Sequence, residues 1–135
     1  MKVRKGSHSV LSVRLHFVFV THYRRACITP LILSSINRMC DQVCRKLDCE
    51  LIEFNGEPDH VHLLVYFHPK NSRSKLAACL KAATSRMVKK DFPEEFDRWY
   101  SKQSFWSGSY YVSSTGGATI EKLKQYIKNQ ESPEG

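Results

Sequence analysis

Two pairs of side chains in this sequence could act together on a phosphodiester. The first pair is His60 and His62, and the second is Tyr126 and Gln130. Imidazoles bind divalent ions, and a phenol becomes a useful nucleophile once a nearby cation stabilises its anion. If the fold unites the two pairs around one metal ion, they predict a site that cuts a phosphodiester through a phosphotyrosine.

The histidine pair lies in a segment whose alternation predicts a β-strand. Successive side chains point to opposite faces, so His60 and His62 share one face while Val61 enters the core. The spacing alone leaves a surface or packing role open, because short motifs of this kind also arise by chance. Gln130 could add a carbonyl oxygen as a third ligand, and phosphate and water would complete an octahedral sphere suited to Mg²⁺ or Mn²⁺.

The second pair lies in a segment that predicts a helix over residues 118–131. Tyr126 and Gln130 are four apart, so they are neighbours on one helix face. They flank an apolar stripe that includes Ile127, which places the phenol at the edge of a packing seam. A tyrosine at such a position can also be an ordinary core-edge aromatic, and the helix alone does not decide between these roles.

Composition places the chain among single-domain proteins that meet polyanions. The 135 residues predict one domain, 1–135, and the net charge of +8 favours nucleic acid, although a basic soluble protein fits equally well. No segment resembles a membrane span or a signal peptide, so we expect no membrane partner and a cytoplasmic location. Five cysteines without a CxxC pair indicate neither a disulfide framework nor a zinc finger.

The expected order of elements is β-α-β-β-α-β followed by one more helix. This order predicts an α+β, ferredoxin-like fold, in which two helices cover one face of a four-stranded antiparallel sheet. Asn55-Gly56 is a hairpin turn signal, and the aromatic segment after Pro93 is expected to be irregular. The predicted strands cover residues 10–21, 50–55, 61–67 and 110–113, and the predicted helices cover 29–47, 72–92 and 118–131.

At this point the chain resembles the HUH-type, single-tyrosine transposases (TnpA proteins) of small bacterial insertion sequences. The resemblance covers nearly the whole chain, and its elements occur in one order. The matching segments are 15–24 (LHFVFVTHYR), 58–64 (PDHVHLL), 80–81, 85–86, 92–93, 106, 109–110, 116–118 (GGA) and 126–130 (YIKNQ).

The resemblance implies a homodimer that cuts and rejoins single-stranded DNA at the hairpin ends of its element. By analogy, Tyr126 attacks the phosphate to give a 5′-phosphotyrosine and a free 3′-OH, while His60, His62 and Gln130 hold the metal. Family members often build each site from two chains, and whether the tyrosine helix acts in cis or in trans stays open. Gly116 and Gly117 would be the hinge that permits exchange, or a simple strand-to-helix turn.

The remaining expectations concern the surroundings of this site. Asp59 is read as a turn residue that supports the histidines without ligating the metal, because it points to the opposite face from His60. A non-cleaving, domesticated relative that binds hairpin DNA or RNA is the alternative function, and a phosphoesterase that uses water as its nucleophile is a third. The tentative DNA-backbone contacts are Arg14, Lys75, Lys81, Arg86, Lys89 and Lys90, each of which could instead be a solvated surface charge.

Overall fold

The computed structural model describes residues 13–68, 72–99, 104–114 and 120–130. Gly116 and Gly117, the proposed hinge, lie outside these residues. In chain order the elements are β1 (Val13–Val20), the 3-10 helix η2 (His22–Arg24), α1 (Pro30–Lys46), β2 (Glu50–Glu57), β3 (His60–Phe67), α2 (Arg73–Asp91), α3 (Pro93–Trp99), β4 (Tyr111–Ser114) and α4 (Ile120–Lys128).

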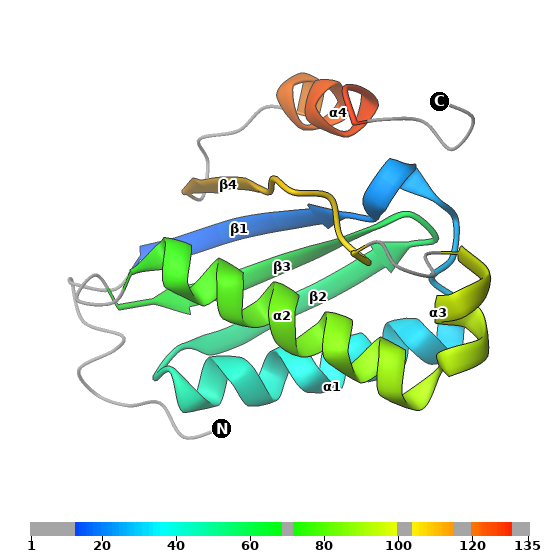
Figure 1. Cartoon of the computed structure of the whole chain (residues 1–135). Helices are drawn as coiled ribbons and strands as arrows, with labels where there is room; N and C mark the ends of the chain where they lie inside the picture. The colour runs from blue at the N-terminus through cyan, green and yellow to red at the C-terminus, as the bar shows by residue number, and fades with distance from the viewer. Residues whose placement is uncertain (1–12, 69–71, 100–103, 115–119, 131–135) are drawn as a thin grey trace.

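The four strands form one antiparallel sheet in the order β2-β3-β1-β4. Helices α1 and α2 cover one face, and α4 lies on the other side of the sheet (Figure 1). The ring of Tyr126 in α4 contacts that of Tyr111 in β4, with centroids 5.4 Å apart. The predicted ferredoxin-like, α+β fold is therefore confirmed, with one helix left over on the face that α1 and α2 do not cover.

The core lies between the sheet and the two long helices. Alternate residues of β1 and β3, such as Phe17 and Leu63, are fully buried against Ile36 of α1 and Leu80 of α2. Both helices begin at caps that the sequence indicates: Thr29 accepts a hydrogen bond from the backbone of Ile32, and Ser72 caps α2. This packing makes the sheet a rigid platform whose other face is available for function.

One predicted turn is wrong. Asn55 and Gly56 do not form a hairpin turn, because both belong to β2 and the chain reverses at Pro58 and Asp59. The glycine is needed for a close approach instead: a Cβ at Gly56 would lie 2.4 Å from Cδ1 of Leu33 in α1. A glycine within a strand often marks such a close contact. From the sequence, the Asn-Gly pair was interpreted as a turn instead.

The segment after α2 is also more regular than expected. Helix α3 begins directly at Pro93, whose fixed φ suits the first helical position, and Glu94 and Glu95 follow in its first turn. Beyond it, Phe105 and Trp106 are almost fully buried in the core. Helix α4 ends at Lys128, so Gln130 lies just past its last turn.

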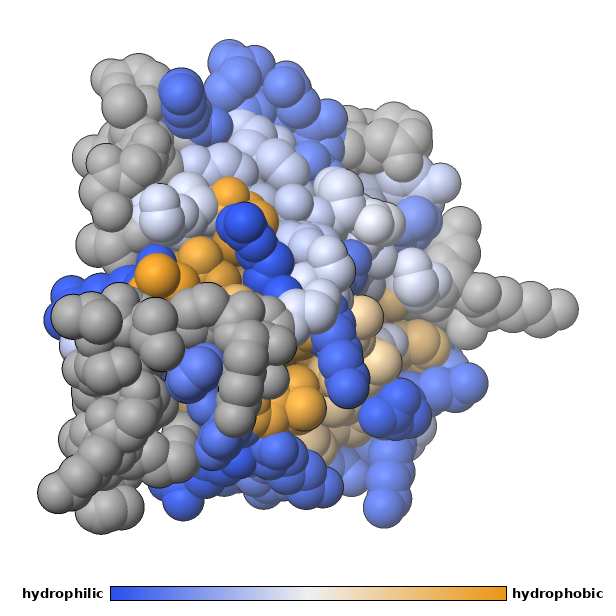
Figure 2. Space-filling view, turned by 90° about the vertical axis from the view of Figure 1, so that its left-hand side faces the viewer, coloured by the Kyte–Doolittle hydropathy of each residue, from blue (hydrophilic) through white to orange (hydrophobic). Residues whose placement is uncertain are grey.

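The surface combines hydrophilic and apolar regions. Figure 2, which views the left-hand side of Figure 1, is mostly hydrophilic around a patch of apolar residues. Of the helices in the described residues, none is long and apolar enough to cross a membrane.

Candidate functional site

His60 and His62 lie on the sheet face that is turned away from α1 and α2. Val61 between them is fully buried in the main core, and strand alternation sends both imidazoles to the opposite face. The two ring centroids are 4.9 Å apart, and the His60 side chain is 13% exposed. The structure therefore brings the two predicted metal ligands together in a site that is partly shielded from water.

Each imidazole has a partner on its Nδ1 atom. His60 Nδ1 lies 2.7 Å from Oδ1 of Asp59, and His62 Nδ1 lies 3.3 Å from Nε2 of His16 in β1. In the tautomer with the proton on Nδ1, each Nε2 atom has a lone pair for a further ligand. Burial, and to a smaller extent the neighbouring His60 and His16, together lower the pKa of His62 to about 4. His62 is therefore neutral at pH 7, which is the form that binds metals.

Asp59 contacts the site in a way that the sequence analysis did not expect. It lies in the turn before β3, where strand alternation does not apply, and its carboxylate folds onto the ring of His60. The prediction that it points to the opposite face is wrong, whereas its supporting position is confirmed. The hydrogen bond from His60 lowers the pKa of Asp59, and the Arg24 guanidinium, with Nε 3.8 Å from Oδ2, lowers it further against the opposing effect of burial.

Buried Thr21, at the end of β1, fixes the turn that carries Asp59. Its backbone N–H and its hydroxyl both lie within hydrogen-bond reach of the Asp59 carbonyl oxygen, at 3.0 and 3.2 Å. The hydroxyl is also 2.8 Å from the carbonyl of Arg25. Between them, Tyr23 and Arg24 adopt positive φ angles of 61° and 54°, a costly conformation for non-glycine residues that tends to occur at functional sites.

Tyr126 lies on the same side of the sheet as the histidines. Its hydroxyl is 3.2 Å from Oγ of Ser109, and its ring contacts Tyr111. Burial raises the pKa of Tyr126, and hydrogen bonds from Ser109 and Ser107 oppose that rise. The phenol is therefore protonated at neutral pH, and it requires a nearby positive charge or a base before it can act as a nucleophile.

The tyrosine and the histidines lie over the same sheet face but over different strands, β4 and β3, which β1 separates. Tyr111 pairs with Val18 of β1, and Val18 pairs with His62, so all three share one sheet face. Strands are about 4.8 Å apart, so Tyr111, which the Tyr126 ring contacts, lies roughly 10 Å from His62. Among the described residues, the polar and ring contacts of Tyr126 are to β4 and the segment before it rather than to the histidine pair.

Gln130 is likewise not directed at the histidines. Its Nε2 donates a hydrogen bond to the carbonyl oxygen of Tyr126, 3.2 Å away, at the end of α4. Tyr126 and Gln130 are thus in contact as their spacing predicted, although α4 ends at Lys128 and does not reach residue 131 as expected. The strand joins His60 to His62. The two halves lie over one sheet face, and the described residues contain no group of three or more histidine, cysteine and acidic side chains that could hold a metal.

The segment before β4, which meets the Tyr126 hydroxyl, is anchored to α2. Trp106 Nε1 donates to Oγ1 of Thr84 at 2.9 Å, and both residues are buried. Nζ of Lys81 donates to the carbonyls of Ser107 and Ser109 at 2.8 and 3.3 Å. Burial lowers the pKa of Lys81. Lys81 therefore secures the loop beside the tyrosine, and a DNA contact by its ammonium group would compete with these bonds.

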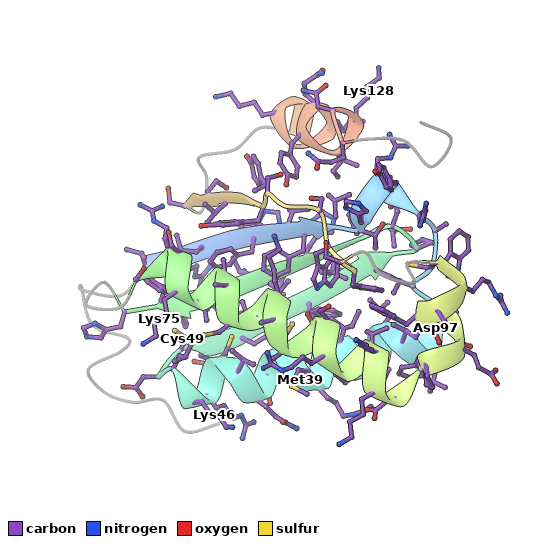
Figure 3. The ribbon with its side chains drawn as sticks, in the orientation of Figure 1. Met39, Lys46, Cys49, Lys75, Asp97 and Lys128 are labelled. Atoms are coloured by element: carbon purple, nitrogen blue, oxygen red, sulfur yellow. The ribbon has the colours of Figure 1, made fainter. Side chains whose placement is uncertain are left out.

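The other basic candidates divide between the two sides of the sheet. Arg14 alternates with Leu15 onto the site face, where its guanidinium lies over the ring of Tyr66. The remaining cations are on α2 and are exposed, with Lys75 labelled on that helix in Figure 3. In the same view Lys128 of α4 points away from the sheet. DNA contacts by the cations of α2 remain predictions. These cations are Lys75, Arg86, Lys89 and Lys90.

A groove of about 550 Å³ opens on the site face beside the histidines. His16 and His62 line it from the middle of the sheet, and acidic Glu53 and Glu57 line it from the edge strand β2. No role for His16 was predicted from the sequence. Its alternation with the buried Leu15 and Phe17 placed it on the site face, but only the register between β1 and β3 shows that it meets His62.

Comparison with known proteins agrees with this architecture. A family model described as "Transposase IS200 like" matches residues 9–130. The transposase of insertion sequence IS200 from Salmonella typhimurium is 28% identical over 124 residues, covering 92% of this chain and 80% of that protein. The ISDra2 transposase TnpA of Deinococcus radiodurans is 22% identical over 134 residues, covering 99% and 95%.

Two solved structures share the fold. A crystal structure of a candidate transposase from Deinococcus radiodurans R1 superposes with a TM-score of 0.83 at 25% identity and covers 98% of both chains. A REP-associated tyrosine transposase bound to a REP hairpin superposes with a TM-score of 0.58 at 10% identity. It covers 94% of this chain and 68% of that one.

Proposed function

Because the chain belongs to the family of IS200-like transposases, we propose that it cleaves and rejoins single-stranded DNA at the ends of an insertion sequence. Tyr126 is the nucleophile, and the reaction passes through a 5′-phosphotyrosine. His60, His62 and Gln130 hold a divalent metal, Mg²⁺ or Mn²⁺. The observation that carries this proposal is the pair of neighbouring imidazoles on the same sheet face as the tyrosine helix.

The side chains of the proposed site carry donor atoms of the kinds that bind divalent ions. His60 and His62 each have Nδ1 engaged; with the protons on these Nδ1 atoms, two Nε2 lone pairs on one face are available, and the carbonyl oxygen of Gln130 would be the third donor. Few protein ligands are typical for Mg²⁺, which keeps several waters or phosphate oxygens. A bound ion would polarise the phosphodiester and offset the charge that develops on it.

The bonds that change in the proposed reaction centre on Tyr126. The oxygen of Tyr126 forms the new bond to phosphorus, the 3′ oxygen leaves and takes up a proton, and the phenol proton passes to water. Ser109, 3.2 Å from that oxygen, orients the hydroxyl before attack. Rejoining reverses the step: a 3′-OH attacks the phosphotyrosine, and the phenol is restored.

The proposed partners are hairpin DNA and a second copy of the chain. The solved structure of a REP-associated transposase bound to a REP hairpin supports a hairpin ligand for this fold. A dimer is supported by the placement of Tyr126, which contacts Ser109 and Tyr111 rather than the histidines. A site that uses both groups requires α4 to move, or α4 of a partner to reach the histidine pair.

Formation of a covalent adduct tests the proposal. Single-stranded DNA from both flanks of the gene, labelled at one end or the other, is incubated with protein and Mg²⁺ or EDTA and run on a denaturing protein gel. A metal-dependent band at the mass of protein plus DNA is expected for wild type and for the control Tyr111→Phe, but not for Tyr126→Phe.

Each alternative gives a different result in the same assay. Cleavage that survives Tyr126→Phe without an adduct would show a nuclease that uses water. A gel shift on hairpin DNA or RNA with neither cleavage nor adduct would show a binding protein that has lost the reaction.

A further inference from the structure

His16 meets one of the two proposed metal ligands directly. Its Nε2 lies 3.3 Å from Nδ1 of His62, and the two rings are stacked at an interplanar angle of 17° with centroids 5.4 Å apart. The contact joins β1 to β3, where His16 pairs with Leu64 and Val18 pairs with His62. It is therefore a diagonal contact across two strands that the core holds in register.

The identity of the donor in this contact decides whether His62 can bind a metal. A neutral imidazole carries one N–H, so its other nitrogen is the one with a free lone pair. If His62 donates from Nδ1, its Nε2 is free to ligate; if His62 accepts at Nδ1, its Nε2 carries the proton and cannot. Metal-bound histidines generally donate their second N–H to a partner that fixes the ring.

His60 shows the same arrangement with a different acceptor. Its Nδ1 lies 2.7 Å from the carboxylate of Asp59, which can only accept when ionised, so Nδ1 carries the proton and Nε2 is free. If both histidines are to bind one ion through Nε2, each must have its Nε2 unprotonated. His62 then requires an acceptor on its Nδ1, and Nε2 of His16 is the atom placed to accept.

We propose that His16 is a positioning residue that accepts a hydrogen bond from Nδ1 of His62 and so holds His62 in the tautomer whose Nε2 ligates the metal. This inference rests on the proposed metal site. His16 itself does not touch the ion; its Nδ1 carries its own proton, and its ring, stacked on His62, fixes the angle of the ligand. Asp59 on His60 and His16 on His62 are thus two acceptors with the same task.

The test uses the full-length, metal-free protein labelled with ¹⁵N in its histidines. Long-range ¹H–¹⁵N spectra distinguish the two tautomers, and a His62→Gln sample identifies the signals of His62. Wild type is expected to show the Nδ1–H tautomer. His16→Phe keeps the stacked ring but has no acceptor, so the Nε2–H tautomer should become populated, whereas His16→Gln, which offers an amide oxygen, should retain Nδ1–H.

Titration with Mn²⁺ provides the second readout. Loss of such a supporting contact typically weakens metal affinity about 10- to 100-fold, which is the loss expected for His16→Phe, while His16→Gln should recover most of it. The matched control His68→Phe, at the far end of β3, should leave affinity unchanged.

Two results would overturn the inference. One is a wild-type His62 in the Nε2–H tautomer, or a tautomer that does not respond to His16→Phe. The other is electron spin echo spectroscopy of the Mn²⁺ complex that counts three bound imidazoles, falling to two in His16→Gln, because His16 would then be a ligand. A protein that forms no DNA adduct but shows the expected tautomer shift would refute the proposed function and leave this inference standing.

Discussion

Replacing Thr84 by valine tests whether the loop beside the tyrosine is anchored as the structure shows. The Thr84 hydroxyl accepts a hydrogen bond from Trp106 Nε1 at 2.9 Å and donates to the carbonyl of Leu80 at 2.7 Å. Thr84 and Trp106 are 1% and 3% exposed, so water cannot replace either partner. Valine keeps the shape of threonine, and the change removes the hydroxyl with little change in volume.

The loss of folding stability in Thr84→Val comes mainly from the Trp106 indole N–H, which loses its acceptor. The Leu80 carbonyl retains its helical hydrogen bond, so its loss of a second donor matters little. A buried donor left without a partner costs about 1–3 kcal/mol. For a chain of this length each kcal/mol lowers the melting temperature by roughly 3–5 °C, so Thr84→Val should melt about 3–15 °C below wild type.

Urea unfolding followed by circular dichroism measures the effect, and a double-mutant cycle isolates its cause. Phenylalanine has no N–H, so in a Trp106→Phe background the same Thr84→Val change should cost almost nothing. Equal costs in the two backgrounds, within about 0.5 kcal/mol, would refute the argument that the indole hydrogen bond holds this loop.

Three further predictions concern the sheet and the histidines that it carries. Gly56→Ala should destabilise the fold by about 1 kcal/mol through its clash with Leu33, and a Leu33→Ala background should remove that penalty in urea unfolding. Asp59→Asn removes the charged acceptor of His60 and should weaken Mn²⁺ binding about 10- to 100-fold, as measured by calorimetry. Asp41→Asn is the surface control, and an unchanged affinity in Asp59→Asn would contradict the supporting role of Asp59. Because the folded pKa of His62, about 4, lies below its ordinary value of 6.5, the unfolded state binds more protons between these values. Stability should therefore fall as pH drops from 6.5 toward 4, and His62→Gln should reduce the slope.

The fold could be predicted because its local signals agree with its global packing. The alternation of buried Val61, Leu63 and Val65 with half-buried neighbours defines β3, and the Thr29-Pro30 pair marks the start of α1. The same alternation placed His60 and His62 on one face. These features depend on periodicity and capping, both of which are properties of a short stretch of sequence.

The contacts that complete the site depend on register and could not be read in this way. His16 meets His62 only because β1 and β3 pair with one particular offset. Ser109 meets the Tyr126 hydroxyl only because α4 returns over β4. Gly56 misled the prediction for the same reason, since the demand for a glycine came from Leu33, a helix residue distant in sequence. Pairings between distant segments are set by tertiary packing.

Identification of the amino acid that becomes joined to DNA would show whether Tyr126 is the nucleophile. The trapped adduct is digested with nuclease and trypsin, and the nucleotide-bearing peptide is sequenced by mass spectrometry. The account predicts a phosphate-linked nucleotide on Tyr126, within the tryptic peptide 125–128. A nucleotide on Tyr111, whose ring lies against that of Tyr126, or on any other residue, would contradict it.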